Sequence, residues 1–376
     1  MSDSTSNDPI VMDQAYLRDI LERLLQTPSP SGMTDEAARL VCQELQRLDI
    51  PFNLTRRGAI RADLEGMRHS PDRAIVAHLD TLGAIVKQIR ADGRLEIAPI
   101  GTWSARFAEG ARVTIHADDG RCFRGGILPR KASGHVFNEE VDLQSGEWTN
   151  LEVRIDERTN SRAETLALGI NVGDTCSVDS QPEFNANGFV SARHLDDKAG
   201  VAAVLTVAKA VREQKIRLPV DCHLLFTISE EIGVGASHVL HGDVAELISV
   251  DNGAIAPGQN TSEYGVTIAM QDSTGPFDWH LTRHLLALCR SHIIEHSRDV
   301  FRYYRSDAAA ALEAGNDIRT ALVCFALDAS HGWERSHLDS LHALAQLLAR
   351  YICSKPLFQR DASALGPLAD FPAAQQ

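Results

Sequence analysis

Two adjacent aspartates, Asp196 and Asp197, stand where an expected strand gives way to an expected helix, in the sequence Ala-Arg-His-Leu-Asp-Asp-Lys-Ala-Gly. Neighbouring carboxylates repel each other unless a positive charge lies beside them. Divalent metal ions accept carboxylate oxygens as ligands and remove that repulsion. The pair therefore predicts a metal site whose other ligands come from elsewhere in the chain.

Further candidate ligands follow short apolar stretches that are typical of buried strands. Each has an ordinary structural explanation: a histidine beside a strand is usually hydrogen-bonded, paired acids usually meet solvent, and Asp-Asn-Gly usually forms a turn. Together they supply imidazole nitrogens and carboxylate oxygens, which suit zinc, cobalt or manganese better than calcium. The candidate set is His78, Asp80, Asp196, Glu230, Glu231, Asp251 and His331.

Alternating strand and helix patterns must position these candidates. A strand over residues 74–77 leads directly to His78. After Phe189 the sequence predicts strands over residues 222–228, 247–250, 265–270, 300–304 and 320–327, and helices over 201–211, 277–290 and 338–352. This alternation predicts an α/β fold, a three-layer sandwich with a mostly parallel central sheet. Sites in such sheets lie beyond the carboxyl ends of the strands, so we expect the candidates to converge there.

The segment 87–188 has a different pattern, with frequent glycine, short alternating stretches and turn signals such as Asp119-Gly120. It predicts a small β-rich, barrel-like domain inserted into the α/β domain. The expected division is therefore 1–86 plus 189–356 for the catalytic domain, 87–188 for the insertion and 357–376 for a loose tail.

Composition excludes several classes of protein. The net charge of −14 and the lack of a Lys/Arg cluster argue against a nucleic-acid partner. No apolar stretch approaches the roughly 20 residues of a membrane-spanning helix, and the start of the chain has no secretory signal pattern. The seven cysteines are scattered and form no C-x-x-C pair, which favours a reducing cytoplasm over a disulfide framework.

Other catalytic patterns are weak. His280 and His284 lie four residues apart on an expected helix, but the glutamate of the H-E-x-x-H motif is missing between them. No G-x-S-x-G elbow, phosphate-binding loop or complete G-x-G-x-x-G follows a strand. Nucleotide-binding and serine-hydrolase functions are therefore disfavoured.

The candidate motifs together resemble metallopeptidase family forty-two, the tetrahedral aminopeptidases related to glutamyl aminopeptidase. The motifs are His78-Leu79-Asp80, Leu195-Asp196-Asp197-Lys198-Ala199-Gly200, Ser229-Glu230-Glu231-Ile232-Gly233, Val250-Asp251 and Ser330-His331. The resemblance implies two divalent ions per chain, zinc or cobalt and otherwise manganese. It implies that His78 and Asp251 hold one ion, that Glu231 and His331 hold the other, and that Asp196 bridges both.

The same resemblance implies that Glu230 is the general base and that Asp80 orients the His78 side of the site. It also implies a cis peptide between Asp196 and Asp197, with Asp197 facing the start of the following helix. The expected substrates are short peptides that lose their amino-terminal residue. The expected assembly is a homo-oligomer based on dimers, up to a tetrahedral dodecamer, in which the β-rich insertion takes part.

The chain departs from the family pattern in two places. Lys198 replaces an arginine after the aspartate pair, and residues 328–333 replace the usual Tyr-x-His-Ser-Pro around the last histidine. In addition, residues 271–279 resemble a subgroup associated with synthesis of the osmoprotectant N-acetylglutaminylglutamine amide. Two alternatives therefore stay open: an amidohydrolase, deacylase or dipeptidase acting on a modified small peptide, and a metal-stabilised assembly without turnover.

Overall fold

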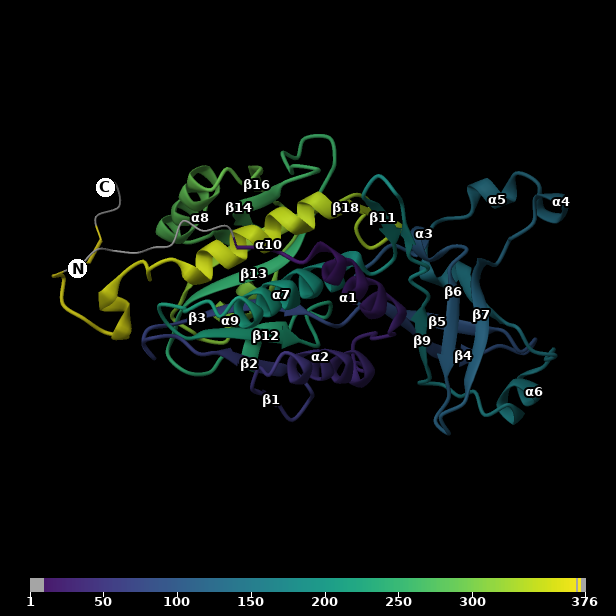
Figure 1. The fold of residues 1–376 in the computed structure, drawn as a ribbon. Coiled ribbons are helices and arrows are strands. Elements are labelled where there is room, and N and C mark those ends of the chain that lie inside the picture. The colour runs from purple at the N-terminus through teal and green to yellow at the C-terminus, as the bar shows by residue number, and fades with distance from the viewer. Residues whose placement is uncertain (1–9, 370, 373–376) are drawn as a thin grey trace.

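A mixed nine-stranded sheet forms the centre of the larger lobe in the computed structural model, which describes residues 10–369, 371 and 372 (Figure 1). Its central strands β12, β3, β13 and β17 are parallel, whereas β2 and β14 run antiparallel to the strands beside them. In order across the sheet the strands are β1 (Phe52–Leu54), β2 (Ile60–Leu64), β12 (Cys222–Thr227), β3 (Asp72–His78), β13 (Val244–Ala254), β17 (Arg319–Leu327), β14 (Val266–Asp272) and β15 (Gly275–Pro276), with β16 (His296–Val300) paired to β14.

Helices cover both faces of this sheet. Val323 and Phe325 of β17 pack into the main core with α7 and α10, while Leu322 and Cys324 pack with Ala308 of α9. Because successive residues of a strand point to opposite faces, α9 lies on the face opposite α7 and α10. The expected three-layer α/β sandwich is confirmed. Its helices are α1 (Gln14–Gln26), α2 (Asp35–Arg47), α7 (Leu195–Glu213), α8 (Trp279–Ser291), α9 (Asp307–Glu313) and α10 (Leu338–Cys353).

Six antiparallel strands close into a barrel that forms a separate lobe, on the right in Figure 1, with its own hydrophobic core. In order around the barrel they are β4 (Gly83–Ile89), β5 (Leu95–Ile100), β8 (Leu151–Ile155), β7 (Cys122–Pro129), β6 (Arg112–His116) and β9 (Thr175–Val178). The expected inserted barrel-like domain is therefore present. Its strands begin before residue 87 and end before residue 188, and the expected division of the chain stays a prediction.

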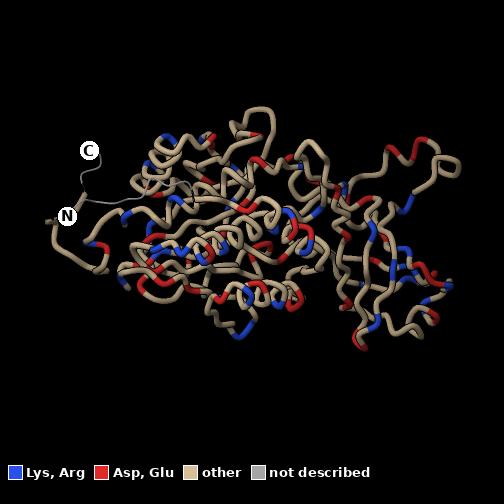
Figure 2. The backbone as a smooth tube through the Cα atoms, viewed as in Figure 1, with Lys and Arg blue, Asp and Glu red and all other residues tan. Residues whose placement is uncertain are grey.

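Short elements complete the chain. A three-stranded sheet lies where the lobes meet and consists of β10 (Glu183–Phe184), β11 (Phe189–Ala192) and β18 (Glu334–His337) (Figure 1). The short helices of the barrel lobe are α3 (Ala105–Ala108), α4 (Gly134–Phe137), α5 (Glu140–Leu143) and α6 (Arg162–Ala167). Acidic and basic residues are interspersed along the backbone of both lobes (Figure 2).

Two local expectations are wrong. The strand predicted over residues 300–304 ends at Val300, and residues 301–304 leave the sheet, although the Phe301 amide still donates to the Gln271 carbonyl. Part of the expected loose tail is packed, because the Leu357 amide donates to Glu246 and Arg319 pairs with Asp361 at 2.7 Å. Among the described helices, none combines the length and apolar character needed to cross a bilayer. All seven cysteines are free thiols.

Candidate metal centre

The seven predicted site residues meet at the carboxyl edge of the central sheet. His78 ends β3, Glu230 and Glu231 follow β12, and Asp251 lies in β13. Asp196 is the second residue of α7, and His331 lies in the loop between β17 and β18. Six of the seven form two groups, whose ligand atoms lie within 4.8 Å of one another in each: His78 with Glu230 and Asp251, and Asp196 with Glu231 and His331.

Asp196 lies between the two imidazoles. Its Oδ1 is 3.1 Å from Nε2 of His78, and its Oδ2 is 3.4 Å from Nε2 of His331. The Asn252 side-chain amide donates to the same Oδ2 at 2.7 Å. The peptide between Asp196 and Asp197 is cis, as the resemblance implied. One carboxylate thus presents an oxygen to each side of the site, which is the arrangement that a bridging ligand needs.

Backbone carbonyls orient both imidazole rings. Nδ1 of His78 lies 3.0 Å from the Asp80 carbonyl, and Nδ1 of His331 lies 2.9 Å from the Thr102 carbonyl. Because a carbonyl only accepts, each ring carries a proton on Nδ1. Nε2 therefore faces the carboxylates: it donates to them when no metal ion is bound, and it is the nitrogen that a bound ion would take as its ligand. Thr102 follows β5 of the barrel, so the inserted domain completes the site.

Asp80 contacts the backbone that carries the two glutamates. Its carboxylate accepts from the amides of Glu230 at 3.0 Å and Glu231 at 3.3 Å, and from the Ser31 hydroxyl at 2.5 Å. Its Oδ1 also lies 3.6 Å from Nδ1 of His78. The side chain therefore fixes the turn after β12 as well as the His78 side, and its role in the reaction stays a prediction.

Three supporting residues were not predicted as part of the site. Glu334 accepts from the amides of Leu195 at 2.7 Å, Asp196 at 3.3 Å and His331 at 2.8 Å, and so ties together two candidate ligands. Asn252 follows Asp251 directly, and Asp307 accepts from the Thr227 hydroxyl at 2.6 Å beneath the site. The only sequence signal for any of the three is that Glu334 lies three residues after His331. This spacing is too common in proteins to identify Glu334 as part of the site.

Asp197 takes a different position from Asp196. Its Oδ2 accepts from the His78 amide at 3.1 Å, and its Oδ1 lies over Gly200 in the first turn of α7. A side chain at Gly200 would collide with that oxygen. The carboxylate thus joins the end of β3 to the start of α7, and the glycine is needed for this close approach.

Burial and mutual repulsion disfavour so many negative charges in one place. Burial raises the pKa of Glu230 and Glu231 well above the usual range, and it raises the pKa of Asp251 to about 8, with repulsion from Asp196 adding to the effect. Burial opposes the charged form of His331, but the hydrogen bond to Asp196 and the negative charges of Glu231 and Asp196 together outweigh burial and raise the pKa of His331 to about 10. Four carboxylates and two imidazoles whose Nε2 atoms face them form a donor set that fits two divalent cations, which would replace the Nε2 protons.

An open cavity of about 740 Å³ gives access to this site. Its lining includes four carboxylates and His331, together with part of the segment after β16 that leaves the sheet. A volume of this size accommodates a small molecule or one end of a peptide. The other lining residues include Ile232, Ala254, Phe301, Tyr303, Tyr304 and Arg305.

Comparisons of the sequence with known proteins point to one family. The sequence model described as M42 glutamyl aminopeptidase matches residues 58–347. A Bacillus subtilis (strain 168) protein named "Putative aminopeptidase YhfE" is 38% identical over 89% of this chain and 97% of its own length.

Solved structures share the fold. The TET aminopeptidase from the marine sediment archaeon Thaumarchaeota archaeon SCGC AB-539-E09 superposes with a TM-score of 0.81 at 18% identity, covering 90% of this chain and 96% of that one. The Pyrococcus horikoshii TET1 peptidase superposes with a TM-score of 0.79 at 21% identity, covering 89% and 99%. With the family match and the Bacillus subtilis relative, the conclusion is that the chain belongs to the M42 glutamyl aminopeptidase family and is a peptide-bond hydrolase.

Proposed function

We propose that this protein is a metal-dependent aminopeptidase that removes the amino-terminal residue of short peptides. The observation that carries the proposal is the position of Asp196, which lines an open cavity and whose two oxygens face the two histidines. His78 and Asp251 would hold one ion, Glu231 and His331 the other, and Asp196 both. Family membership argues against a metal-stabilised assembly without turnover.

The ligand set accepts zinc or cobalt, and otherwise manganese, because nitrogen and oxygen donors bind all three. When bound, the two ions supply Lewis acidity toward the scissile carbonyl and lower the pKa of a water held with them from about 15.7 toward about 7. The histidines and the three ligating carboxylates hold the site in position, with the rings fixed by the carbonyls of Asp80 and Thr102.

Glu230 is the proposed general base. Its side chain is 14% exposed, compared with 4% for Glu231 and 5% for Asp196, so it is more open to the cavity than these two acids. Burial raises the pKa of Glu230 well above its usual range. A raised pKa makes the ionised carboxylate a stronger base, which can accept a proton from water and then deliver it to the departing amine. Glu230 also groups with His78 and Asp251 within 4.8 Å, so its carboxylate lies beside the position proposed for the first ion.

The test is Glu230→Gln, which keeps the shape of the side chain but removes the base. We expect kcat to fall by about 10²–10⁴-fold, with the metal content of the purified protein unchanged by elemental mass spectrometry. Glu213→Gln, at the far end of α7, is the matched control and should keep wild-type activity. Undiminished hydrolysis of aminoacyl amides by Glu230→Gln would refute the assignment.

The alternative is an amidohydrolase, deacylase or dipeptidase that acts on a modified small peptide. One observation favours it: the cavity wall is bonded to the segment that resembles the osmoprotectant-associated subgroup. The Phe301 amide donates to the Gln271 carbonyl, and the Ser273 amide donates to the Tyr304 carbonyl. Rates measured side by side on free-amine, N-acylated and C-amidated dipeptides separate these activities. An aminopeptidase needs the free amine but not a free carboxyl end, a dipeptidase needs both free ends, and a deacylase needs the acyl group.

Homo-oligomeric assembly is also part of the proposal. The Pyrococcus horikoshii relative can assemble into a tetrahedron or a large octahedral shell. In this chain α4 and α5 project from the barrel lobe (Figure 1) and expose Val136 and Leu143, apolar side chains that an assembly would cover. Sedimentation of the wild type and of Val136→Ser/Leu143→Ser tests this. The cytoplasmic location stays a proposal, supported by the free cysteines.

A further inference from the structure

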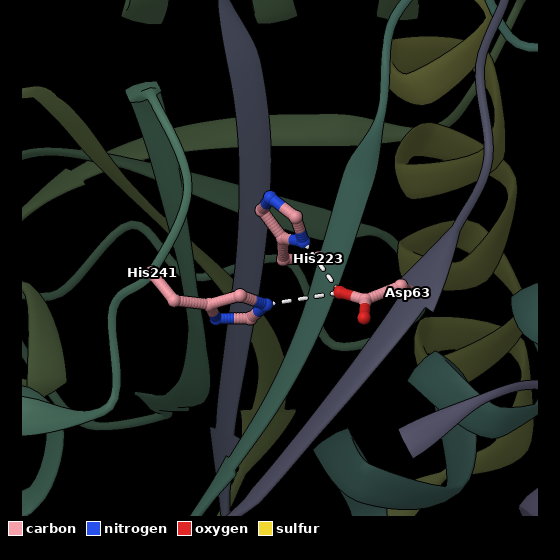
Figure 3. Close-up of side chains that lie close together, drawn as sticks. All are labelled: Asp63, His223 and His241. Atoms are coloured by element: carbon pink, nitrogen blue, oxygen red, sulfur yellow. Dashed lines mark hydrogen bonds and ion pairs between the residues drawn. The ribbon is translucent and has the colours of Figure 1, made fainter. Parts of the chain in front are cut away.

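A second cluster of histidine and carboxylate side chains lies at the opposite edge of the same sheet. Asp63 of β2 and His223 of β12 are directly paired across the two strands. His241 reaches them from the segment between η2 (Gly235–His238) and β13 (Figure 3). We propose that Asp63, His223 and His241 bind a third divalent ion of the zinc class, distinct from the pair at the carboxyl edge.

The distances are close to those of a metal site. Asp63 Oδ1 lies 2.7 Å from Nδ1 of His223 and 3.0 Å from Nε2 of His241, and all three ligand atoms lie within 4.8 Å of one another (Figure 3). Ligand atoms about 2.0–2.1 Å from a tetrahedral zinc ion are roughly 3.3 Å apart. Side-chain shifts of well under about 1 Å on the Asp63 side therefore make room for the ion.

Asp72 supplies the outer contact that a metal-binding histidine commonly has. Its Oδ2 lies 3.3 Å from Nε2 of His223, the nitrogen that faces away from Asp63. A proton on Nε2 leaves the lone pair of Nδ1 directed at the proposed ion. The Asp72 side chain is only 6% exposed, and its Oδ1 has no hydrogen-bond partner among the residues that the structure describes. A cation in the cluster would help to balance the negative charge of this buried Asp72 carboxylate.

The segment that carries His241 is held in place. The Arg61 guanidinium donates to the carbonyls of three consecutive residues, His238 at 2.8 Å, Val239 at 2.6 Å and Leu240 at 3.1 Å. The Asp243 amide donates to Asp72 Oδ2 at 2.9 Å. Between them Gly242 has φ +68°, and a side chain there would lie 2.6 Å from the same carboxylate oxygen. Only glycine allows the segment to approach this closely.

Solvent reaches the cluster, which lies far from the proposed catalytic centre. The side chains of His241 and Asp63 are 25% and 39% exposed, so an ion can enter and water can complete its coordination. Asp72 and His78 are opposite ends of β3, and seven extended residues span about 20 Å. The ion therefore takes no part in peptide hydrolysis. Its effect is to tie β2, β12 and the segment before β13 together.

The test compares zinc content among four full-length proteins after metal removal, zinc add-back and gel filtration. These are the wild type, His241→Gln, Asp196→Asn and the double variant. We expect His241→Gln to hold one zinc ion fewer per chain than the wild type, and the double variant one fewer than Asp196→Asn. Peptidase activity of His241→Gln should stay within about twofold of the wild type, because this edge is remote from the reaction. His238→Gln, a histidine just before the cluster, is the control and should lose no zinc.

Thermal unfolding gives a second readout that does not depend on activity. Added zinc should raise the Tm of Asp196→Asn more than that of the double variant, because a ligand that binds only the folded state stabilises it. Equal zinc content in wild type and His241→Gln would overturn the proposal and leave a purely hydrogen-bonded cluster. Since each comparison is between matched pairs, failure of the aminopeptidase proposal would not alter the result.

Discussion

The two edges of the central sheet use the same residue types in opposite ways. At the carboxyl edge, buried carboxylates outnumber histidines and line a cavity of about 740 Å³. At the amino edge, two histidines share Asp63 at a partly exposed position. Buried, like-charged groups beside a cavity are suited to polarising a substrate, whereas a small site that ties three segments together is suited to stabilising the fold. Ligand type alone therefore does not separate the proposed catalytic centre from the proposed structural site, whereas burial and access do.

The largest expected effect comes from comparing the same substitution, aspartate to asparagine, at the two edges. Asp196→Asn weakens the shared ligand of the proposed pair of ions, so we expect kcat/KM to fall by roughly a thousandfold or more, since Lewis acidity supplies several kcal/mol. Asp63→Asn at the other edge should leave kcat/KM within about twofold. Steady-state hydrolysis of one aminoacyl amide by both variants measures the contrast. Comparable losses in the two would show that the edges are not functionally distinct.

Most of the candidate ligands at the carboxyl edge could be predicted from the sequence because they lie at or near the end of a short apolar stretch. His78 is the last residue of β3, Asp251 follows the apolar part of β13, and the sheet topology brings such residues together. The amino edge has no comparable signal. His223 is the second residue of β12, Asp63 lies in another strand, and His241 lies in an irregular segment, so only the pairing register brings them together.

The cavity wall could not be predicted for a related reason. The sequence predicts that residues 301–304 continue a strand, because aromatic residues such as Phe301 and Tyr304 are common in strands. In the structure Phe301 packs with Ala308 and Leu322 in a small core of its own, and Tyr303 is exposed. Tertiary packing outweighs the local preference there. The contribution of the Thr102 carbonyl was likewise hidden, because it comes from the inserted barrel.

A middle-sized effect is expected from Glu334→Gln. This variant tests whether a residue outside the candidate ligand set holds those ligands in position. Glu334 accepts from the amides of Asp196 and His331, and an amide side chain has only one oxygen with which to replace those bonds. We expect metal affinity to fall by about 10–100-fold, the usual cost of losing an outer contact. Competition with a chelating dye measures it. Glu263 forms a surface ion pair with Arg335, so Glu263→Gln is the control and should leave the metal affinity unchanged.

The last expected effect, spread over several pH units, is a difference in how the two edges respond to pH in metal-free protein. Burial lowers the pKa of Lys198 to about 7, so between about pH 7 and 10.5 the unfolded chain binds a proton that the folded chain does not. Stability attributable to Lys198 therefore rises with pH across that window, by up to about 1.4 kcal/mol per unit.

His223 responds in the opposite sense. Burial opposes its charged form, but hydrogen bonds to Asp63 and Asp72 outweigh burial and raise the pKa of His223. Its contribution to stability is complete below its unfolded pKa of about 6.5 and is lost as the pH rises through the folded value. Urea unfolding of chelator-treated protein across pH 6 to 10 should show a flatter slope at high pH for Lys198→Met, and a smaller loss above pH 6.5 for His223→Gln. If both substitutions change the pH dependence of the unfolding free energy in the same direction, then Lys198 and His223 do not respond to pH in opposite senses.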